Sequence, residues 1–402
     1  MSGREDILAS GGGETPAASA SARPKPPLRF DRHELAGAFG DLGTDLPLIA
    51  AMILIAELDA TGVLLLFGAL QILTGLAYRM PLPVQPLKAM AALVITQQLG
   101  GATLYGGGLA IGVMMLVLTA SGLLGWLARV IPVAVVRGVQ FGLGLQLALL
   151  AGRDFISTGG VPGYALAAVA FALVVLLWGH RRWPAALAVI ALGLVYSAIF
   201  DIDWSALAGG VGVQLPQARM PAWADVWTGL LVLALPQLPL SLGNSLLATE
   251  RLAKDLFPDR APSVRKLGFT YALMNLVSPL FGGVPVCHGS GGMAGHYAFG
   301  ARTGGSVIIY GGCFIVAGLL FSGSFSHLVR LFPKSILGVL LFFEGLALLR
   351  HVRDAGLGRG EWFVTFVVGL MAFTLPNGYL VGLVTGWVLH AVMKRHERLR
   401  EA

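Results

Sequence analysis

The sequence predicts an all-α polytopic membrane protein with about 14 transmembrane segments in a 7+7 inverted repeat. Three observations lead to this fold class: the chain carries few charges, its positive charges gather in alternate loops, and polar interruptions occupy corresponding places in its two halves. Of its 402 residues, 56% are hydrophobic and 12% are charged, whereas soluble domains contain about 25% charged residues. With a mean hydropathy of +0.76, such a chain cannot form a water-soluble globule.

Hydropathy along the chain gives the individual segments. We place them near 35–56, 60–78, 84–98, 105–128, 130–151, 162–178, 183–200, 226–249, 264–281, 286–298, 301–322, 333–349, 361–375 and 377–393. Glycine and proline within these runs favour helices, because the strands of a β-barrel would alternate with period two. The predicted units are a disordered cytoplasmic tail (1–33), a first repeat (34–200), a second repeat (226–395) and a short cytoplasmic tail (396–402).

The positive residues provide an independent test of this segment map. With the N-terminus inside, 22 of the 28 lysines and arginines fall in inside loops and tails, and four fall in outside loops. One miscounted span would exchange the two sides for every later loop, so this distribution supports the map. We expect both termini to be cytoplasmic and the chain to lie in the cell (inner) membrane. Because the charges occupy short loops rather than one helix face, the net charge of +7 does not indicate nucleic acid.

Proline and glycine interrupt the two halves at matching places. In the first half the interruptions lie at 40–47 and 80–88, and in the second half they lie at 236–245 and 282–290. An odd number of segments per half would insert the second half upside down. Interrupted segments at corresponding positions of an inverted repeat indicate a transporter binding site at the repeat interface.

The third segment is too short to cross the membrane. Pro81, Pro83 and Pro86 exclude the α region for the residues before them, so 80–85 should be extended, and Pro86 can start a helix. From there to Gln98 the helix would be roughly 20 Å long, whereas the hydrocarbon layer is about 30 Å thick. The same reasoning applies to 282–286 and the helix that follows. Two half-helices that point their N-termini at one another near the midplane would form an anion site.

Lys88 falls in the first turn of this third segment and is the lysine that our map places within a span. A lysine at that depth is costly unless it is functional or paired. Lys88 therefore either holds an anion or forms an ion pair with Asp41 or Asp45.

Other residues near the two half-helices have a functional and a structural interpretation. Gln85, His288 and Ser290 supply hydrogen-bond donors, and Gly289 and Gly291 allow a ligand to approach the backbone. Alternatively, Gln85 caps the broken backbone, His288 is a satisfied core residue, and the glycines serve close helix packing.

Three carboxylates are candidates for ion coupling. Asp41 and Asp45 lie four residues apart, hence on one helix face, and Glu344 lies in the twelfth segment. Carboxylates within the membrane commonly bind protons or cations, or pair with a base. Each of the three could equally have a structural role.

The eighth segment has neutral polar groups. Gln237 and Ser241 share one helix face, and so do Ser241 and Asn244. Neutral donors that face the gap suit an oxyanion better than a row of carboxylates would.

Long motifs in both halves resemble those of the molybdate transporters related to the sulfate permeases. In the first half these are ELAGAFGDLGTDLP (34–47) and PLPVQPLKAMAA (81–92). In the second half they are PQLPLSLGNS (236–245), DLFP (255–258) and PVCHG (285–289) continuing to GHY (295–297). The motifs occur in the expected order, and the similarity covers about residues 30–395.

This resemblance implies a transporter that imports molybdate by movement of a core domain (segments 1–4 and 8–11) against a gate domain (segments 5–7 and 12–14). Tungstate is a further candidate substrate. Because a negative-inside potential opposes entry of a dianion by about 2.3 kcal/mol per charge for each 100 mV, we expect coupling to protons. We expect a setting in membrane lipid, with a homodimer as a candidate assembly. The sequence contains no paired-aspartate metal motif, nucleophile elbow or phosphate-binding loop, so we expect no cofactor, no metal and no enzymatic activity; we also expect no C-terminal regulatory domain. The alternatives are a transporter of sulfate or another oxyanion and an anion channel. The residues expected to bind substrate are Thr44, Gln85, Leu87, Lys88, Gln237, Ser241, Asn244, His288, Gly289, Ser290 and Gly291; those expected to couple transport to an ion are Asp41, Asp45 and Glu344.

Overall fold

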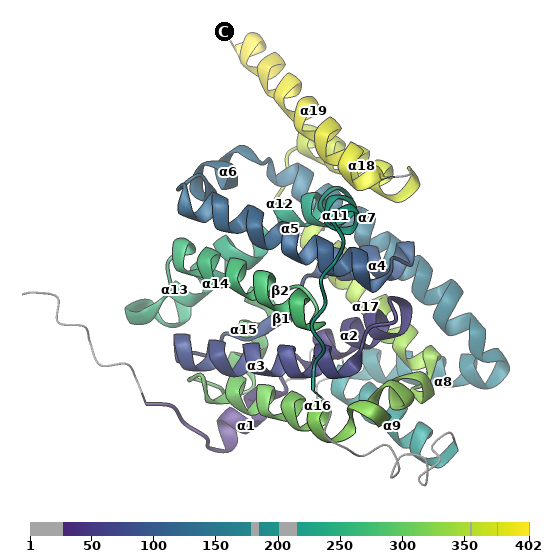
Figure 1. The fold of residues 1–402 in the computed structure, drawn as a ribbon. Coiled ribbons are helices and arrows are strands. Elements are labelled where there is room, and N and C mark those ends of the chain that lie inside the picture. Colours follow the sequence, from purple (N-terminus) through teal and green to yellow (C-terminus); the bar gives the residue numbers. More distant parts are fainter. Residues whose placement is uncertain (1–26, 178–184, 201–214, 354–355, 376, 402) are drawn as a thin grey trace, which may run out of the picture.

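The computed structural model describes residues 27–177, 185–200, 215–353, 356–375 and 377–401, which form helices, two short strands and their connections (Figure 1). The α-helices are α1 (Arg32–Ala38), α2 (Leu42–Ile55), α3 (Ala60–Tyr78), α4 (Lys88–Gln97), α5 (Gly101–Ala120), α6 (Leu124–Val130), α7 (Val133–Leu150), α8 (Gly160–Leu176), α9 (Ala185–Phe200), α11 (Trp223–Gly229), α12 (Leu235–Leu240), α13 (Thr249–Leu256), α14 (Val264–Val277), α15 (Ser290–Ala298), α16 (Gly305–Leu331), α17 (Lys334–Arg353), α18 (Arg359–Thr374) and α19 (Gly378–Glu401). The strands are β1 (Val84–Pro86) and β2 (Val286–His288). Shorter π- and 3₁₀-helical turns are η1 (Ala151–Ile156), η2 (Ser157–Gly159), η3 (Leu230–Ala234), η4 (Ser241–Ala248), η5 (Pro258–Arg260) and η6 (Ser278–Phe281).

Each predicted segment overlaps one or more of these helices. The second coincides with α3, where the Asp59 carboxylate caps the helix by accepting hydrogen bonds from the N–H groups of Thr61 and Gly62. The first is divided, since α1 ends before Gly40 and α2 begins after Asp41. The eighth is part of a continuous helical stretch that runs from α11 to α13 and contains π-helical turns.

The chain ends differ from the predicted tails. Helix α1 begins at Arg32, inside the range assigned to the N-terminal tail, and α19 continues through Glu401, past the predicted end of the last segment. Residues 1–26 of the predicted N-terminal tail lie outside the described residues.

Among the described residues, five helical stretches are long and apolar enough to cross a membrane by length and composition. Three further helices are apolar but shorter: Gly160–Leu176, Ala185–Phe200 and Gly305–Leu320. These features agree with a polytopic membrane protein, while the total of 14 segments stays a prediction. The five long stretches are Arg32–Ile55, Ala60–Tyr78, Gly101–Ala120, Val133–Ile156 and Trp223–Leu256.

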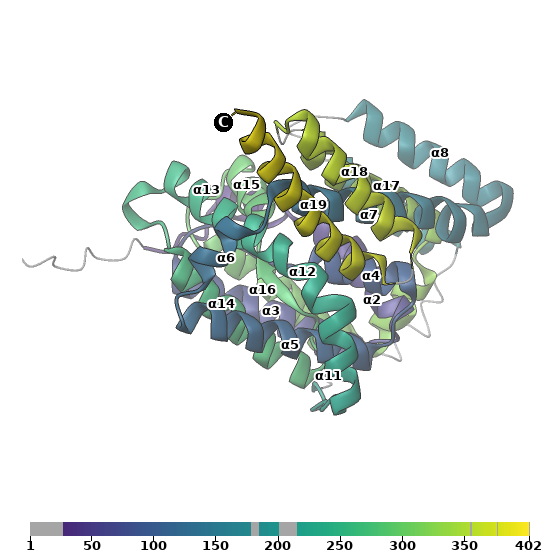
Figure 2. The same ribbon diagram turned by 90° about the horizontal axis from the view of Figure 1, so that it is seen from above.

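One group of helices consists of α2 to α5 and α11 to α16, and we call it the first group. Within it α3 packs along α16, and α5 packs along α14 (Figures 1 and 2). Glycines permit the close approach of α3 and α16: a Cβ on Gly304 would overlap the carbonyl of Gly75. Helices α5 and α14 also approach closely, because a Cβ on Gly268 of α14 would collide with the Thr119 hydroxyl of α5.

Helices α7, α8, α9, α17, α18 and α19 form what we call the second group. Figure 2 shows α7, α8, α17 and α18 together on one side of the molecule, apart from α3, α5, α14 and α16. Helix α7 packs against both α17 and α18. The contacts again use small residues, because a Cβ on Gly144 would lie 2.8 Å from the Gly345 carbonyl oxygen, and one on Gly142 would lie 2.7 Å from the Cβ of Ala372.

Strands β1 and β2 pair in antiparallel fashion at the centre of the first group, with Gln85 opposite Cys287. The backbone is extended here because of the prolines in the first stretch and the glycines and proline in the second. Each strand is held by an amide side chain from a neighbouring helix: Gln71 on α3 bonds to the N–H and C=O of Val84, and Asn275 on α14 bonds to those of Val286.

A buried glutamate fixes the start of α16. The Glu34 carboxylate on α1 accepts hydrogen bonds from the backbone N–H groups of Arg302, Thr303 and Ser306 at 2.9, 2.8 and 2.9 Å. A carboxylate at a helix N-terminus satisfies free N–H groups and the positive end of the helix dipole. Glu34 therefore joins the beginning of the first half to the second half.

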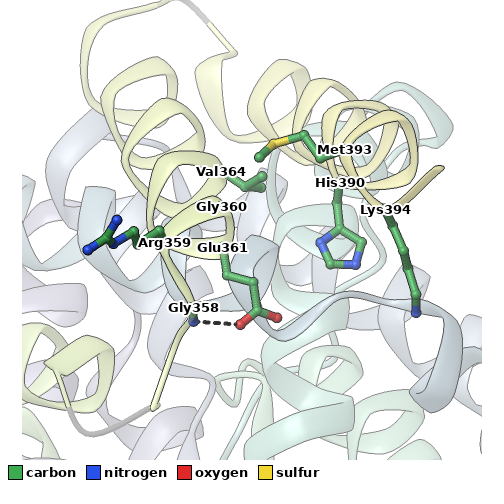
Figure 3. Close-up of a pocket in the computed structure, with 8 residues that line it drawn as sticks. All are labelled: Gly358, Arg359, Gly360, Glu361, Val364, His390, Met393 and Lys394. Carbon is green, nitrogen blue, oxygen red and sulfur yellow. Dashed lines mark hydrogen bonds between the residues drawn. The ribbon is translucent and has the colours of Figure 1, made fainter. Parts of the chain in front are cut away.

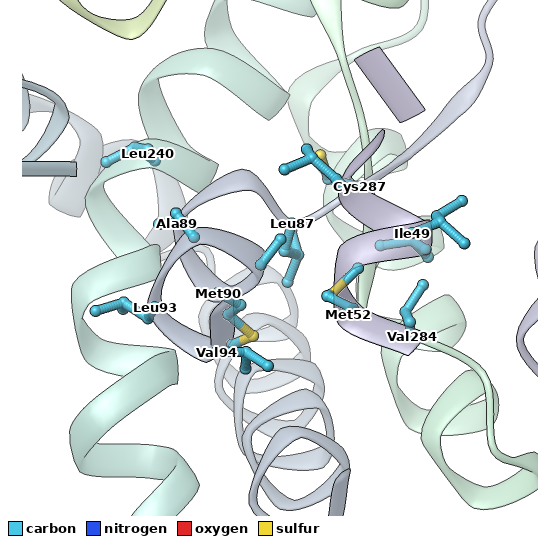
Figure 4. Packing of buried hydrophobic residues seen from close by; sticks show 14 of the residues in the cluster. Ile49, Met52, Leu87, Ala89, Met90, Leu93, Val94, Leu240, Val284 and Cys287 are labelled. Atoms are coloured by element: carbon cyan, nitrogen blue, oxygen red, sulfur yellow. The ribbon is translucent and has the colours of Figure 1, made fainter. Parts of the chain in front are cut away.

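The apolar core surrounds the start of α4. Figure 4 shows Leu87 and Met90 beside Met52 of α2, with Val284 nearby. Leu87 and Met90 are 1% and 0% exposed. The helix that carries Lys88 is thus fixed by apolar packing on the side opposite to its polar contacts.

Candidate functional site

The sequence predicts two short helices after extended stretches, and the structure has them. Pro86, the predicted first helical residue, instead ends β1, because the extended backbone continues through the strand pairing. Helix α4 begins at Lys88 just after β1, and α15 begins at Ser290 just after β2. Because the strands are antiparallel, the two helices leave the strand pair in opposite directions. Helix N-termini next to one another in a protein interior present N–H groups and positive dipole ends to the same region.

The two N-termini differ in how they are capped. The side-chain carbonyl of Gln237 on α12 accepts hydrogen bonds from the N–H groups of Ala89 and Met90, at 3.0 and 3.1 Å. The N–H of Leu87 donates to the Pro285 carbonyl at 3.0 Å. No side chain in the described part of the chain caps the N-terminus of α15. The start of α15 is therefore the more open of the two.

Lys88 forms an ion pair with Glu344 of α17, with 3.0 Å between Nζ and Oε1. The side chains of Lys88 and Glu344 are 22% and 10% exposed. The sequence had offered Asp41 or Asp45 as the structural partner, and that choice was wrong. The ion pair links the first group of helices to the second.

Asp41 pairs with Gln85 instead. The Gln85 amide donates to both oxygens of Asp41, at 2.8 and 2.7 Å, and both side chains are buried. Gly289 lies directly against the Gln85 side chain, and a Cβ at Gly292 would collide with Asp41. The broken backbone is capped by Gln71 and Asn275, so the alternative in which Gln85 does this is not what the structure shows.

The predicted polar residues of the eighth segment form a row along α12 and η4, with two separate sets of hydrogen bonds. Gln237 donates to the Ser241 hydroxyl at 3.1 Å, and Ser241 bonds to the Tyr271 hydroxyl at 2.7 Å. One helical turn further on, the Asn244 side-chain oxygen accepts from the Ser290 hydroxyl at 3.2 Å. This row therefore extends from the start of α4 to the start of α15.

A small cavity of about 20 Å³ lies between these side chains. Such a volume holds roughly one water molecule. It includes Ser245 of the eighth segment and one polar residue that we did not predict, Gln140 of α7; an amide among the glycines of a predicted membrane segment was the available signal for Gln140. The cavity is lined by Gln85, Lys88, Gln140, Gln237, Leu240, Asn244, Ser245, Cys287 and Leu348.

A larger cleft of about 770 Å³ opens between α2 of the first group and α8, α9 and α17 of the second. Thr44 and Glu344 both line it, and so do Arg350 and Arg353. It lies on the side that the charge distribution predicts to be cytoplasmic. A second cleft of about 440 Å³ lies between the same two groups, at the C-terminal ends of α2 and α7. Glu344 therefore lines the larger cleft, while its buried Oε1 contacts Lys88.

Three of the predicted residues have contacts away from the small cavity. The His288 ring bonds to the Thr270 hydroxyl at 2.9 Å and packs edge-on against Tyr78, while the Leu87 side chain lies in the apolar core. Asp45 is fully buried, and its Oδ2 accepts a hydrogen bond from Tyr310 at 3.1 Å. Gly291 has open space around the position of a Cβ.

A third hollow of about 410 Å³ lies between α18 and α19, outside the predicted site (Figure 3). In this hollow the Glu361 carboxylate accepts a hydrogen bond from the N–H of Gly358, and His390 and Lys394 line the opposite wall. None of the predicted site residues lines it. Within the described residues, no group of three or more His, Cys, Asp or Glu side chains could hold a metal ion.

Comparison with solved structures places the fold among membrane transporters. The chain superposes on the transmembrane domain of the cyanobacterial bicarbonate transporter BicA with a TM-score of 0.68 and 18% identity, covering 90% of this chain and 98% of that one. At this identity the likeness concerns the fold alone. It confirms a helical membrane-protein fold.

Sequence comparisons identify the family. The family model described as "Molybdate transporter of MFS superfamily" matches residues 33–147 and 229–348. Molybdate transporters 1 and 2 of Arabidopsis thaliana are 33% and 35% identical to this chain, over 90% of its length and 88% and 87% of theirs. These relatives are transporters, which agrees with the expectation that the chain is not an enzyme. The resemblance inferred from the motifs is therefore confirmed, and the chain belongs to the molybdate transporter family.

Proposed function

We propose that this chain is a secondary active transporter that imports molybdate, with tungstate as a second substrate. The observation that carries the proposal is Lys88, a charged side chain at the N-terminus of a short helix, surrounded by neutral hydrogen-bond donors. A cation, helix N-terminal N–H groups and amide donors together suit an oxyanion. The molybdate transporters of A. thaliana support the choice of molybdate.

In this proposal the anion binds between the starts of α4 and α15. Lys88 supplies the positive charge, and Gln85, Gln237, Asn244 and Ser290 supply hydrogen bonds. The cavity there holds about one water molecule, so it must widen to take a tetrahedral dianion. Movement of the second group of helices away from the first would widen it, because Gln140 and Leu348 of the second group form one wall.

The proposed topology has 14 segments in a 7+7 inverted repeat, with core and gate domains that correspond to our first and second groups. The matching hydrogen bonds of Gln71 and Asn275 to the two strands support the repeat. We place both termini in the cytoplasm and the protein in the lipid of the inner membrane, as the charge distribution favours. A homodimer is part of the proposal.

Import of a dianion needs an energy source. A negative-inside potential opposes entry by about 2.3 kcal/mol per charge for each 100 mV. Protons that enter together with the anion would offset this cost, and Asp41, Asp45 and Glu344 are the carboxylates that could carry them.

The test is uptake of labelled molybdate into proteoliposomes that contain the purified protein, with and without an imposed inward proton gradient. The proposal predicts accumulation that needs the gradient and that is reduced by excess unlabelled molybdate. Uptake of molybdate that does not depend on the proton gradient would indicate an anion channel. Absence of uptake by correctly folded protein would contradict the proposed function.

A second candidate is a transporter of sulfate or other oxyanions. The polar groups around Lys88 favour it, because they recognise charge and oxygen atoms rather than a particular central atom. Excess sulfate in the same uptake assay separates the two: competition supports the broader substrate range, and its absence supports molybdate.

A further inference from the structure

Glu344 is a charged residue of the site, and it belongs to the second group of helices. It reaches across from α17 and contacts Lys88 of α4 at 3.0 Å. Both side chains are largely buried. This ion pair therefore uses the same ammonium group that the proposed function assigns to the anion.

The charges around Glu344 explain why it holds Lys88. Asp41, just before α2, and Asp45 on α2 repel it electrostatically, and Arg350 and Arg353 line the same cleft further along α17. Arg137 on α7 donates to Gln140 at 2.7 Å. Helices α8 and α9, which also pack against α17, contain no charged residue. Lys88 contacts Glu344 directly, and it neutralises a carboxylate in an acidic environment.

One ammonium group in this confined space cannot hold both a carboxylate and a dianion. If the anion took Lys88 while Glu344 stayed ionised, a displaced carboxylate would face the dianion and two aspartates at low dielectric. Such an arrangement is more costly than neutralising the carboxylate. The cleft of about 770 Å³ reaches Glu344, so a proton can arrive from water on that side.

We propose that Glu344 occupies Lys88 in place of the substrate and that the oxyanion displaces it, with Glu344 taking up one proton from solvent as it leaves. This inference rests on the proposed function and names the coupling residue of that site. Protons and charges balance in this exchange. The Glu344 carboxylate and one proton form a neutral carboxylic acid, and Lys88 exchanges one anionic partner for another. Asp41 and Asp45 then keep their contacts with Gln85 and Tyr310.

The sign of the pH dependence follows. If binding takes up a proton, a rise in pH weakens binding, by up to about tenfold for each pH unit. A glutamine at position 344 cannot take up the proton and carries no charge to compete for Lys88. The affinity of the Glu344→Gln variant for molybdate should therefore be independent of pH. At the alkaline end of the pH range this affinity should exceed that of the wild type.

The experiment measures the molybdate affinity of the purified protein by calorimetry across the neutral pH range. Wild type, Glu344→Gln and Glu361→Gln are compared; Glu361 is a matched control because it caps α18, away from the site. We expect a pH-dependent affinity for wild type and Glu361→Gln, and a pH-independent, tighter affinity for Glu344→Gln. Retention of the wild-type pH dependence by Glu344→Gln, or weaker binding at every pH, would overturn the inference.

A second measurement uses wild-type protein alone, in case Glu344→Gln does not fold. Calorimetry in two buffers of different ionisation enthalpy counts the protons taken up for each bound molybdate. The inference predicts about one proton for each anion in the pH range where affinity changes tenfold per unit. Binding with no proton uptake overturns this inference and leaves molybdate binding intact, whereas folded protein that binds no molybdate at any pH overturns the proposed function as well.

Discussion

Gln71 and Asn275 make the same pair of hydrogen bonds in the two halves of the molecule. The Gln71 amide donates to the Val84 carbonyl at 2.6 Å and accepts from the Val84 N–H at 2.8 Å. The Asn275 amide does the same for Val286, at 2.6 and 2.9 Å. Both amides are fully buried. They satisfy backbone groups that an extended strand inside an apolar protein would otherwise leave unpaired.

Loss of either amide should destabilise the fold to a similar extent. Gln71→Ala and Asn275→Ala each leave one buried N–H and one buried C=O without a partner, at a cost of about 1–3 kcal/mol per group. Thermal unfolding of the detergent-purified variants measures this, with the exposed Gln97→Ala as control. A large effect at one position and none at the other would contradict equivalent roles.

Removal of Lys88 should affect binding and stability separately. Lys88→Ala leaves Glu344 as a buried, unpaired carboxylate, which costs about 3 kcal/mol, and it removes the cation that we propose holds the anion. Adding Glu344→Gln should restore most of the stability without restoring molybdate binding. Calorimetry and thermal unfolding of both variants provide the test. Molybdate binding by the double variant at wild-type affinity would exclude Lys88 as the anion ligand.

The two glycines at the start of α15 should respond differently to alanine. At Gly289 a Cβ would overlap the Gln85 side chain and displace it from Asp41, so Gly289→Ala should reduce both stability and uptake. At Gly291 a Cβ would meet open space. Because alanine favours a helix over glycine by about 1 kcal/mol, Gly291→Ala should keep the fold.

The effect of Gly291→Ala on transport tests whether the anion approaches the backbone of α15. We expect a weaker affinity for molybdate with an unchanged or higher melting temperature. Gly243→Ala, where a Cβ also meets open space, serves as the matched control in uptake assays. Unaltered affinity in Gly291→Ala would place the anion away from this helix terminus.

Tyr310 should stabilise Asp45. The Tyr310 hydroxyl donates to one carboxylate oxygen, and within the described residues the other oxygen has no hydrogen-bond partner. Tyr310→Phe should therefore cost about 1–3 kcal/mol. In the Asp45→Asn background the same substitution should cost less, and thermal unfolding of the four proteins of this cycle measures the difference. Equal costs in both backgrounds would show that the two side chains do not interact.

Local sequence patterns predicted the elements that position the site. Pro83 and Pro86 exclude helix before Lys88, and Gly283 and Pro285 do the same in the second half, so two extended stretches followed by short helices could be expected. The limits of α3 followed from hydropathy, and the structure adds that Asp59 caps its start. These features depend on neighbours in the chain, which a single sequence contains.

Long-range contacts could not be predicted in the same way. Hydropathy indicated that Lys88 lies within a membrane segment, but it could not indicate which carboxylate forms an ion pair with it. The partner is Glu344, which is far from Lys88 in the sequence, and not Asp41 or Asp45, which are closer in the sequence. The orientation of the His288 side chain could not be predicted from the sequence either. Side chains alternate along a strand, so Cys287 lines the cavity while His288 points to Tyr78.

The most direct test of the account is to locate the bound anion. Crystals of the protein grown with molybdate, and separately with tungstate, would give an anomalous difference map at the absorption edge of the metal. The account predicts a peak between the starts of α4 and α15, within hydrogen-bond distance of the Lys88 Nζ, and displacement of Glu344 from that atom. A peak elsewhere, with Lys88 still paired to Glu344, would contradict it.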